Sequence, residues 1–122
     1  MFAAAVVLAL LLPAQKAAES PSDVTLMKAK LGGSCSADFT VKDADGKPVF
    51  DALVHVRVRY GFAGVKRADL EVGTSSQGRA RIEGLPDKAK PMTYDITKDD
   101  KKTEVAQDVS TTCRATFDVV LK

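Results

Sequence analysis

The sequence has no tryptophan, no asparagine and a single histidine, His55, and each absence excludes a class of site. Without asparagine the chain has no acceptor for N-glycosylation. One histidine, with no cysteine–histidine cluster around it, falls short of the three or four ligands of a typical metal site. No serine lies in a G-x-S-x-G frame, and no glycine loop has the P-loop form. We therefore expect no catalytic residue, no metal site and no cofactor, and we predict that the chain is not an enzyme.

An excess of charge of one sign is also missing. The 18 lysine and arginine residues nearly balance the 16 aspartate and glutamate residues, which leaves a net charge of +2 with both signs interspersed. A dedicated nucleic-acid surface would need clustered positive charge, so we expect no nucleic-acid partner. With five phenylalanines, two tyrosines and no tryptophan, the chain is also poorly equipped to form the cleft of a glycosidase.

Residues 1–12, MFAAAVVLALLL, are an unbroken apolar run. As a helix, the eleven residues from Phe2 to Leu12 would span about 16 Å, which is too short for a bilayer core of roughly 30 Å. The run fits the apolar part of a secretory signal, with cleavage after Ala14, Ala17 or Ala18. The alternative is an uncleaved N-terminal anchor. We predict a signal peptide at 1–18, a single domain at 19–122 with no membrane span, and a secreted or periplasmic location.

The two cysteines are the next signal. An even cysteine count in an exported chain predicts a disulfide, here between Cys35 and Cys113. Lipidation of Cys35 is disfavoured, because a charged stretch separates it from the apolar run. Each cysteine opens a strand on its inward face. The two strands should therefore run parallel, either side by side or facing each other across the core.

After residue 20 the dominant pattern is an alternation of apolar and polar residues, which is typical of half-buried strands. It is clearest in LVHVRVRY, where Val54, Val56 and Val58 share one face. Turn signals separate the segments, and seven or eight short strands favour a sandwich. The expected strands are 24–31, 35–41, 53–60, 65–72, 79–83, 92–98, 103–109 and 112–121.

One hairpin allows the register to be predicted. Joining 53–60 to 66–72 through the loop 61–65 places Val56 opposite Leu70 on the apolar face and Arg57 opposite Asp69 on the polar face. A shift of one residue would break both patterns. The register also makes His55 a surface residue beside Glu71, which disfavours a catalytic or metal-binding role for it. The alternative is that the two segments lie in different sheets.

The stretch KDADGKP, residues 42–48, resembles the start of a calcium loop. Asp43 and Asp45 supply two carboxylates, but Gly46 follows at once, the third acid is missing and the flanks are strands. Asp-Gly is also the leading two-residue turn signal, because both residues tolerate positive φ. We therefore predict a tight turn.

A basic patch with aromatic residues lies around the GFAG loop. Its candidate binding residues are Arg59, Tyr60, Phe62, Lys66 and Arg67. An aromatic residue at a loop tip, flanked by cations, could contact an acidic glycan, a lipopolysaccharide or a protein. The alternative is a solvated sheet face whose charges protect the edge strand.

The stretches FTVKDADGKPVFDALVHVRV, TSSQGRARIEGLP and MTYDITK resemble the carboxypeptidase-regulatory-like, or transthyretin-like, domains of secreted bacterial proteins. The match covers about residues 35–98, and Ser75 replaces the aspartate usual in that family. The resemblance implies an all-β, immunoglobulin-like or transthyretin-like sandwich of about seven antiparallel strands. The chain ends VVLK and has one histidine, unlike the hydroxyisourate hydrolases of the transthyretin group.

These observations predict an exported, non-catalytic β-sandwich module with a structural or protein-interaction role outside the cytoplasm. The alternative is a carbohydrate- or lipid-binding module that uses the loop around 59–67. A small hydrolase comes third. The expected partner is a larger extracytoplasmic protein or a surface glycan.

Overall fold

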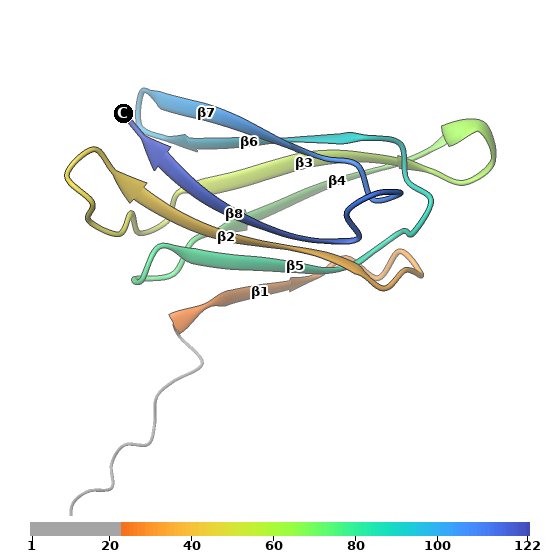
Figure 1. Cartoon of the computed structure of the whole chain (residues 1–122), viewed down its shortest axis with the longest axis horizontal. Coiled ribbons are helices and arrows are strands. Elements are labelled where there is room, and N and C mark those ends of the chain that lie inside the picture. The colour runs from red at the N-terminus through yellow and green to blue at the C-terminus, as the bar shows by residue number, and fades with distance from the viewer. Residues whose placement is uncertain (1–22) are drawn as a thin grey trace, which may run out of the picture.

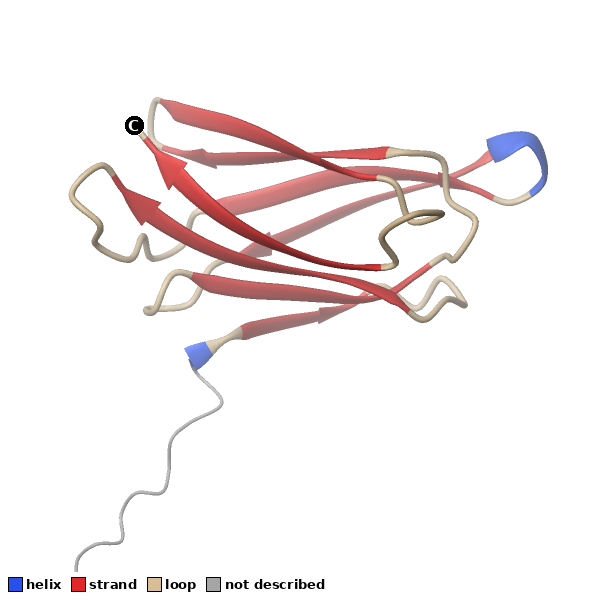
Figure 2. Cartoon of the chain, viewed as in Figure 1, coloured by secondary structure: helices blue, strands red, loops and turns tan. Residues whose placement is uncertain are grey.

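The structure is a computed structural model that describes residues 23–122, so the predicted signal peptide at 1–18 lies outside the described residues. Within residues 23–122, no helix is long and apolar enough to cross a membrane. Among the described residues, strands are the main regular structure, and loops make up most of the rest (Figures 1 and 2). The elements are β1 (Thr25–Lys28), β2 (Cys35–Asp43), β3 (Leu53–Tyr60), the 3-10 helix η4 (Phe62–Gly64), β4 (Lys66–Gly73), β5 (Arg79–Leu85), β6 (Met92–Lys98), β7 (Lys101–Gln107) and β8 (Arg114–Leu121).

Two four-stranded sheets pack face to face, with the orders β1-β5-β2-β8 and β4-β3-β6-β7. The predicted all-β sandwich is confirmed, with eight strands rather than about seven. The second sheet is antiparallel throughout. The first sheet is mixed, because β1 runs parallel to β5 and β2 runs parallel to β8, and the β2–β8 pair is the parallel pair that the cysteines predict. The parallel β2–β8 pair follows from the two cysteines, which join the strand starts at one end of the sandwich.

The core comes from the inward faces that the alternation predicts. Phe39, Tyr94 and Phe117 form its aromatic centre, with ring centroids 4.9 to 5.8 Å apart. Such offset and edge-to-face contacts add about 0.5–1.5 kcal/mol per pair to the gain from burial. Aliphatic side chains fill the rest, among them Val41, Val54, Val56, Val58, Leu70, Val72, Ile82, Leu85, Ile96, Val119 and Leu121.

The predicted β3–β4 hairpin has the expected register. Val56 pairs with Leu70 on the buried face, and Arg57 pairs with Asp69 on the exposed face. The Arg57 Nε donates to Asp69 Oδ1 at 3.2 Å. His55 pairs with Glu71 along the backbone, but its Nε2 lies 3.4 Å from Asp69 Oδ1, so its nearest acid is the diagonal neighbour.

The stretch at 42–48 is the predicted tight turn. Asp43 closes it, because its Oδ1 accepts the backbone N–H groups of Asp45 at 2.9 Å and Lys47 at 3.0 Å. Gly46 takes the positive φ of 83° that the turn requires. The hydrogen bond from Lys47, more than that from Asp45, holds the pKa of the Asp43 carboxyl below its ordinary value.

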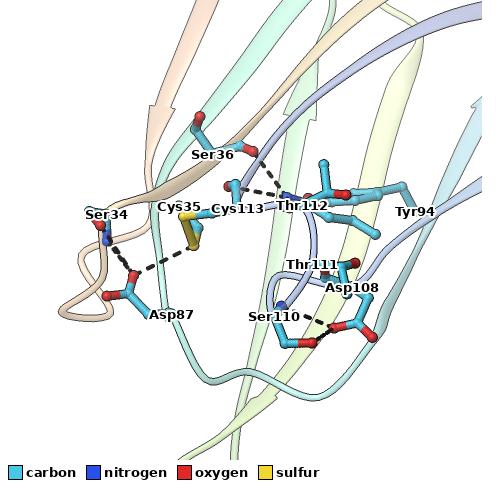
Figure 3. Close-up of a disulfide and its surroundings, with 11 residues drawn as sticks. Ser34, Cys35, Ser36, Asp87, Tyr94, Asp108, Ser110, Thr111, Thr112 and Cys113 are labelled. Atoms are coloured by element: carbon cyan, nitrogen blue, oxygen red, sulfur yellow. Dashed lines mark hydrogen bonds between the residues drawn. A yellow bond between two sulfur atoms is a disulfide. The ribbon is translucent and has the colours of Figure 1, made fainter.

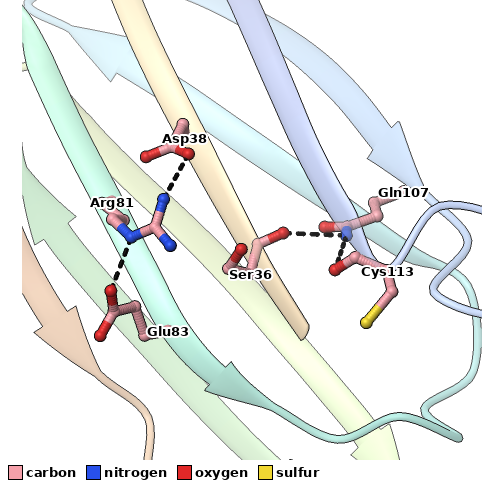
Figure 4. Close-up of polar contacts among 6 residues, drawn as sticks. All are labelled: Ser36, Asp38, Arg81, Glu83, Gln107 and Cys113. Carbon is pink, nitrogen blue, oxygen red and sulfur yellow. Dashed lines mark hydrogen bonds and ion pairs between the residues drawn. The ribbon is translucent and has the colours of Figure 1, made fainter. Parts of the chain in front are cut away.

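A buried polar chain crosses the core beside the aromatic centre. The Tyr94 hydroxyl donates to Gln107 Oε1 at 2.6 Å, and Gln107 Nε2 donates to the carbonyl oxygens of Thr112 at 2.8 Å and Ser36 at 3.2 Å. Figure 4 shows the Gln107 amide between Ser36 and Cys113. Burial raises the pKa of the Tyr94 phenol above its ordinary value. Gln107 thus ties the end of β7 to the starts of β2 and β8.

Candidate functional site

The predicted binding residues gather at the β3–β4 turn, at one end of the sandwich (Figure 1). Phe62 is 91% exposed, and Val65 is 68% exposed beside it. We call residues 59–67 the tip segment. Ala63, at its centre, has a φ of 55°, which is uncommon for a residue other than glycine. The turn thus holds a fully exposed aromatic ring on a strained backbone.

Positive charge surrounds this turn. Arg59 and Arg67 are direct cross-strand partners, and Tyr60 faces Lys66, whose Nζ lies 6.0 Å from the Tyr60 ring centroid. Like charges directly opposite each other destabilise a strand pair. All five predicted residues thus lie in one hairpin, but not on one face. Tyr60 packs against the core, and its pair with Lys66 lies on the face opposite to that of Arg59 and Arg67.

A second candidate site lies on the outer face of the β1-β5-β2-β8 sheet, where sequence reasoning had placed none. It is an open groove of about 620 Å³. Apolar Val24 and Leu26 form one side of it. The polar residues that line it are Asp38, Thr40, Arg79, Arg81, Glu83 and Thr116.

Arg81 is the centre of this groove. Its Nη1 donates to Asp38 Oδ2 at 2.5 Å, and its Nε donates to Glu83 Oε2 at 2.7 Å, as Figure 4 shows. These bonds, first to Glu83 and then to Asp38, raise the pKa of Arg81 above its ordinary value. Two carboxylates thus hold the guanidinium plane in place. Among residues 23–122, no hydrogen-bond partner is found for the other three of its five N–H donors.

Alternation along the chain could have placed these side chains on outward faces, because residues 79, 81 and 83 alternate with buried Ala80 and Ile82. It could not have shown that Asp38 lies opposite Arg81, since that pairing joins residues of β2 and β5 that are 43 positions apart in the chain. The signal that was missed is therefore the pairing between strands.

A third cluster of side chains lies around the disulfide (Figure 3). Cys35 and Cys113 are bonded, as predicted, with their Cα atoms 4.6 Å apart. Asp87 Oδ1 accepts the Ser34 N–H at 2.9 Å and lies 3.5 Å from Cys35 Sγ. Among residues 23–122, Cys35, Asp87 and Cys113 are the one group of three or more potential metal-ligating side chains close enough to share an ion. A disulfide is stable in oxidising compartments, which agrees with a location outside the cytoplasm.

No family model and no curated protein matches the chain. Solved structures of enzymes do match the chain. The chain is similar to the catechol 1,2-dioxygenase of Acinetobacter sp. ADP1, with a TM-score of 0.54 and 14% identity over 81% of this chain and 57% of the enzyme. It is also similar to the 3-chlorocatechol 1,2-dioxygenase of Rhodococcus opacus 1CP, with a TM-score of 0.53 and 13% identity over 84% of this chain and 65% of the enzyme.

These likenesses correct the functional prediction. A non-catalytic structural or interaction module was expected, with a carbohydrate- or lipid-binding module as the alternative, but the similar structures are enzymes. At this identity they show the fold alone, a two-sheet β-sandwich. The chain spans just over half the length of the Acinetobacter enzyme. The prediction was wrong because the sequence motifs on which it rested specify turns and core contacts. Structural modules and enzymes built on one fold share such features.

Proposed function

We propose that this chain is a substrate-binding β-sandwich domain of an enzyme, and that the outer groove around Arg81 holds a small hydroxylated ring. The observation that carries the proposal is the fixed guanidinium. Asp38 and Glu83 orient Arg81 inside the groove, at a side-chain exposure of 35%. An arginine held by two carboxylates presents its free donors in a set direction.

The chemistry of the groove favours a neutral polar ligand. The positive charges of Arg79 and Arg81 balance the negative charges of Asp38 and Glu83, so a charged ligand gains little there. A hydroxyl group can accept a hydrogen bond from the guanidinium and donate one to a carboxylate oxygen. The carbon face of a ring would rest on Leu26, which is 49% exposed.

The similar structures support this choice of ligand. The Acinetobacter and Rhodococcus structures are named as a catechol and a chlorocatechol dioxygenase, names that give a ring with two neighbouring hydroxyl groups. Because the chain spans only part of their length, the proposal assigns it the binding of such a ring, and the reaction belongs to the whole enzyme.

Amide chemical shifts during titration of the purified chain with catechol test the proposal. We expect changes confined to β1, β2 and β5. Arg81→Lys keeps the charge but loses the planar fork, so catechol affinity should fall at least about tenfold, or roughly 1.4 kcal/mol. Arg57→Lys is the matched control, because Arg57 pairs with Asp69 on the other sheet. Equal losses in both variants, or changes scattered over the surface, would contradict the proposal.

We also infer that the domain works outside the cytoplasm, after removal of residues 1–18, as a carboxypeptidase-regulatory-like or transthyretin-like sandwich. The disulfide and the apolar N-terminal run support the location, and the Gly46 and Gly78 turns of the matched motifs support the family. Intact mass of the native protein, with and without reduction and alkylation, tests the location. Two free thiols on a full-length chain would contradict it.

For the tip segment, we infer contact with an acidic surface on a larger partner protein. The opposed Arg59 and Arg67 and the exposed Phe62 support it, because both features cost the isolated domain stability or solubility. If the contact exists, the native complex should dissociate in the variant Arg67→Glu and persist in Arg114→Glu, an exposed arginine elsewhere. If the partner is an acidic glycan instead, an acidic polysaccharide column should retain the wild type and should not retain variants in which Arg59 or Arg67 is replaced by glutamate.

A further inference from the structure

Three potential metal ligands lie close together near the start of β2. They are the side chains of Cys35, Cys113 and Asp87. Their potential ligand atoms all lie within 4.8 Å of one another, although the two sulfur atoms are bonded in the structure. We propose that reduction of this disulfide creates a site for a thiophilic divalent cation such as Zn²⁺, with the two thiolates and the Asp87 carboxylate as ligands.

The position of Asp87 carries the inference. Its Oδ1 lies 3.5 Å from Cys35 Sγ, and no hydrogen joins them, because a disulfide sulfur has no proton to donate. Tetrahedral zinc binds sulfur at about 2.3 Å and carboxylate oxygen at about 2.0–2.2 Å, which separates the two ligand atoms by about 3.5 Å. The carboxylate therefore already stands at ligand distance from the sulfur that reduction would free.

The backbone keeps the ligands in place. Asp87 is held by the Ser34 N–H at 2.9 Å and by the Ser34 hydroxyl at 3.3 Å, as Figure 3 shows. The cysteines lie at the starts of neighbouring parallel strands, where Ser36 N–H donates to the Cys113 carbonyl at 2.8 Å. Three protein ligands would leave the fourth tetrahedral position to water.

A dithiol can reduce the Cys35–Cys113 disulfide by thiol–disulfide exchange. One thiolate of the dithiol attacks Sγ of Cys113, which is half-buried, whereas Cys35 is 1% exposed. Cys35 leaves as a thiolate, and the second thiol of the reductant then displaces Cys113 and closes its own disulfide. Two electrons pass from the dithiol to the cystine. The cation then replaces the two thiol protons, which go to solvent.

Electrostatics favours the cation in the reduced state alone. Two thiolates beside a carboxylate repel one another, and a divalent cation removes that repulsion. In the oxidised state the sulfur atoms are neutral and bonded to each other, so Asp87 remains as a single exposed carboxylate. The cluster would thus bind metal only after reduction.

The test is Zn²⁺ and Co²⁺ binding to the purified protein, oxidised and phosphine-reduced. Reduced protein should bind one Zn²⁺ per chain and give thiolate-to-cobalt charge-transfer absorption, whereas oxidised protein should give neither. Asp87→Asn should weaken Zn²⁺ binding at least about tenfold. Asn keeps the acceptor for Ser34 but loses the charge. Asp108→Asn is the matched control, because Asp108 also accepts a backbone N–H, that of Ser110, and lies outside the cluster. This variant should bind Zn²⁺ as the wild type does.

Thermal unfolding checks that the reduced protein is still folded when it binds Zn²⁺. Zn²⁺ should raise the melting temperature of the reduced wild type and of Asp108→Asn, but only weakly that of Asp87→Asn, because a ligand that binds the folded state stabilises it. Zinc held by two cysteines of an unfolded chain would not depend on Asp87. Equal affinity of Asp87→Asn and the wild type, or reduced protein without cobalt–thiolate absorption, would overturn the proposal.

Discussion

Removing the disulfide should cost this domain a large part of its stability. Cys35 and Cys113 are 78 residues apart in sequence. In the chain-entropy model, opening a loop of that length returns about 15 cal/mol/K to the unfolded chain, or about 4.5 kcal/mol at 25 °C. A domain of this size has a total stability of roughly 5–15 kcal/mol. At about 4–8 °C per kcal/mol, the melting temperature should fall by roughly 20–35 °C.

The suitable variant is the double substitution Cys35→Ala/Cys113→Ala. Cys35 is 1% exposed, so serine there would add the cost of a buried hydroxyl to the loss of the bond. Circular dichroism during thermal and urea unfolding measures the change, since the chain has no tryptophan to report it. Wild type reduced by a dithiol without metal is the control, and its midpoint should lie close to that of the double variant. A loss below about 1 kcal/mol, with the fold intact, would refute the reasoning.

Two further predictions concern the interior. Tyr94 favours its neutral form in the folded state, so the stability it contributes is full below the unfolded pKa of about 10 and is lost as pH rises above it. Urea unfolding between pH 9 and 11 should show this loss in the wild type and not in Tyr94→Phe, and identical slopes would contradict it. Gly78 has a φ of 74°, and a Cβ there would lie 2.4 Å from the Val41 carbonyl oxygen. Gly78→Ala should therefore cost about 2–3 kcal/mol, against about 1 kcal/mol for Gly46→Ala, whose Cβ would meet open space; equal losses in urea unfolding would show that the close approach to Val41 does not matter.

Local patterns predicted much of the fold. The alternation in β3 and β4 specified their register, because a one-residue shift would bury Arg57 and expose Val56. The Asp-Gly pair predicted the turn that Asp43 closes, and the paired inward cysteines predicted that β2 and β8 run parallel. The parallel position of β1 beside β5 was not predictable, because a four-residue edge strand carries no mark of its partner.

The candidate sites divide in the same way. The tip segment was predictable, because Arg59, Phe62 and Lys66 are close in sequence and a hairpin keeps them close in space. The groove was not, since Asp38 meets Arg81 only when β2 pairs with β5. Asp87 near Cys35 was hidden for the same reason, because it lies in a loop 52 residues away.

The sequence by itself determined the β-sandwich, the disulfide and the charged hairpin tip, because each depends on side-chain period, cysteine count or neighbours along the chain. The tertiary structure alone decided which strands lie side by side, and with them the Arg81 groove and the carboxylate of Asp87 beside the cystine. The physical reason is that period and turn chemistry act over a few residues. Strand pairing is chosen by the packing of the whole core, which brings distant outward side chains together as a consequence.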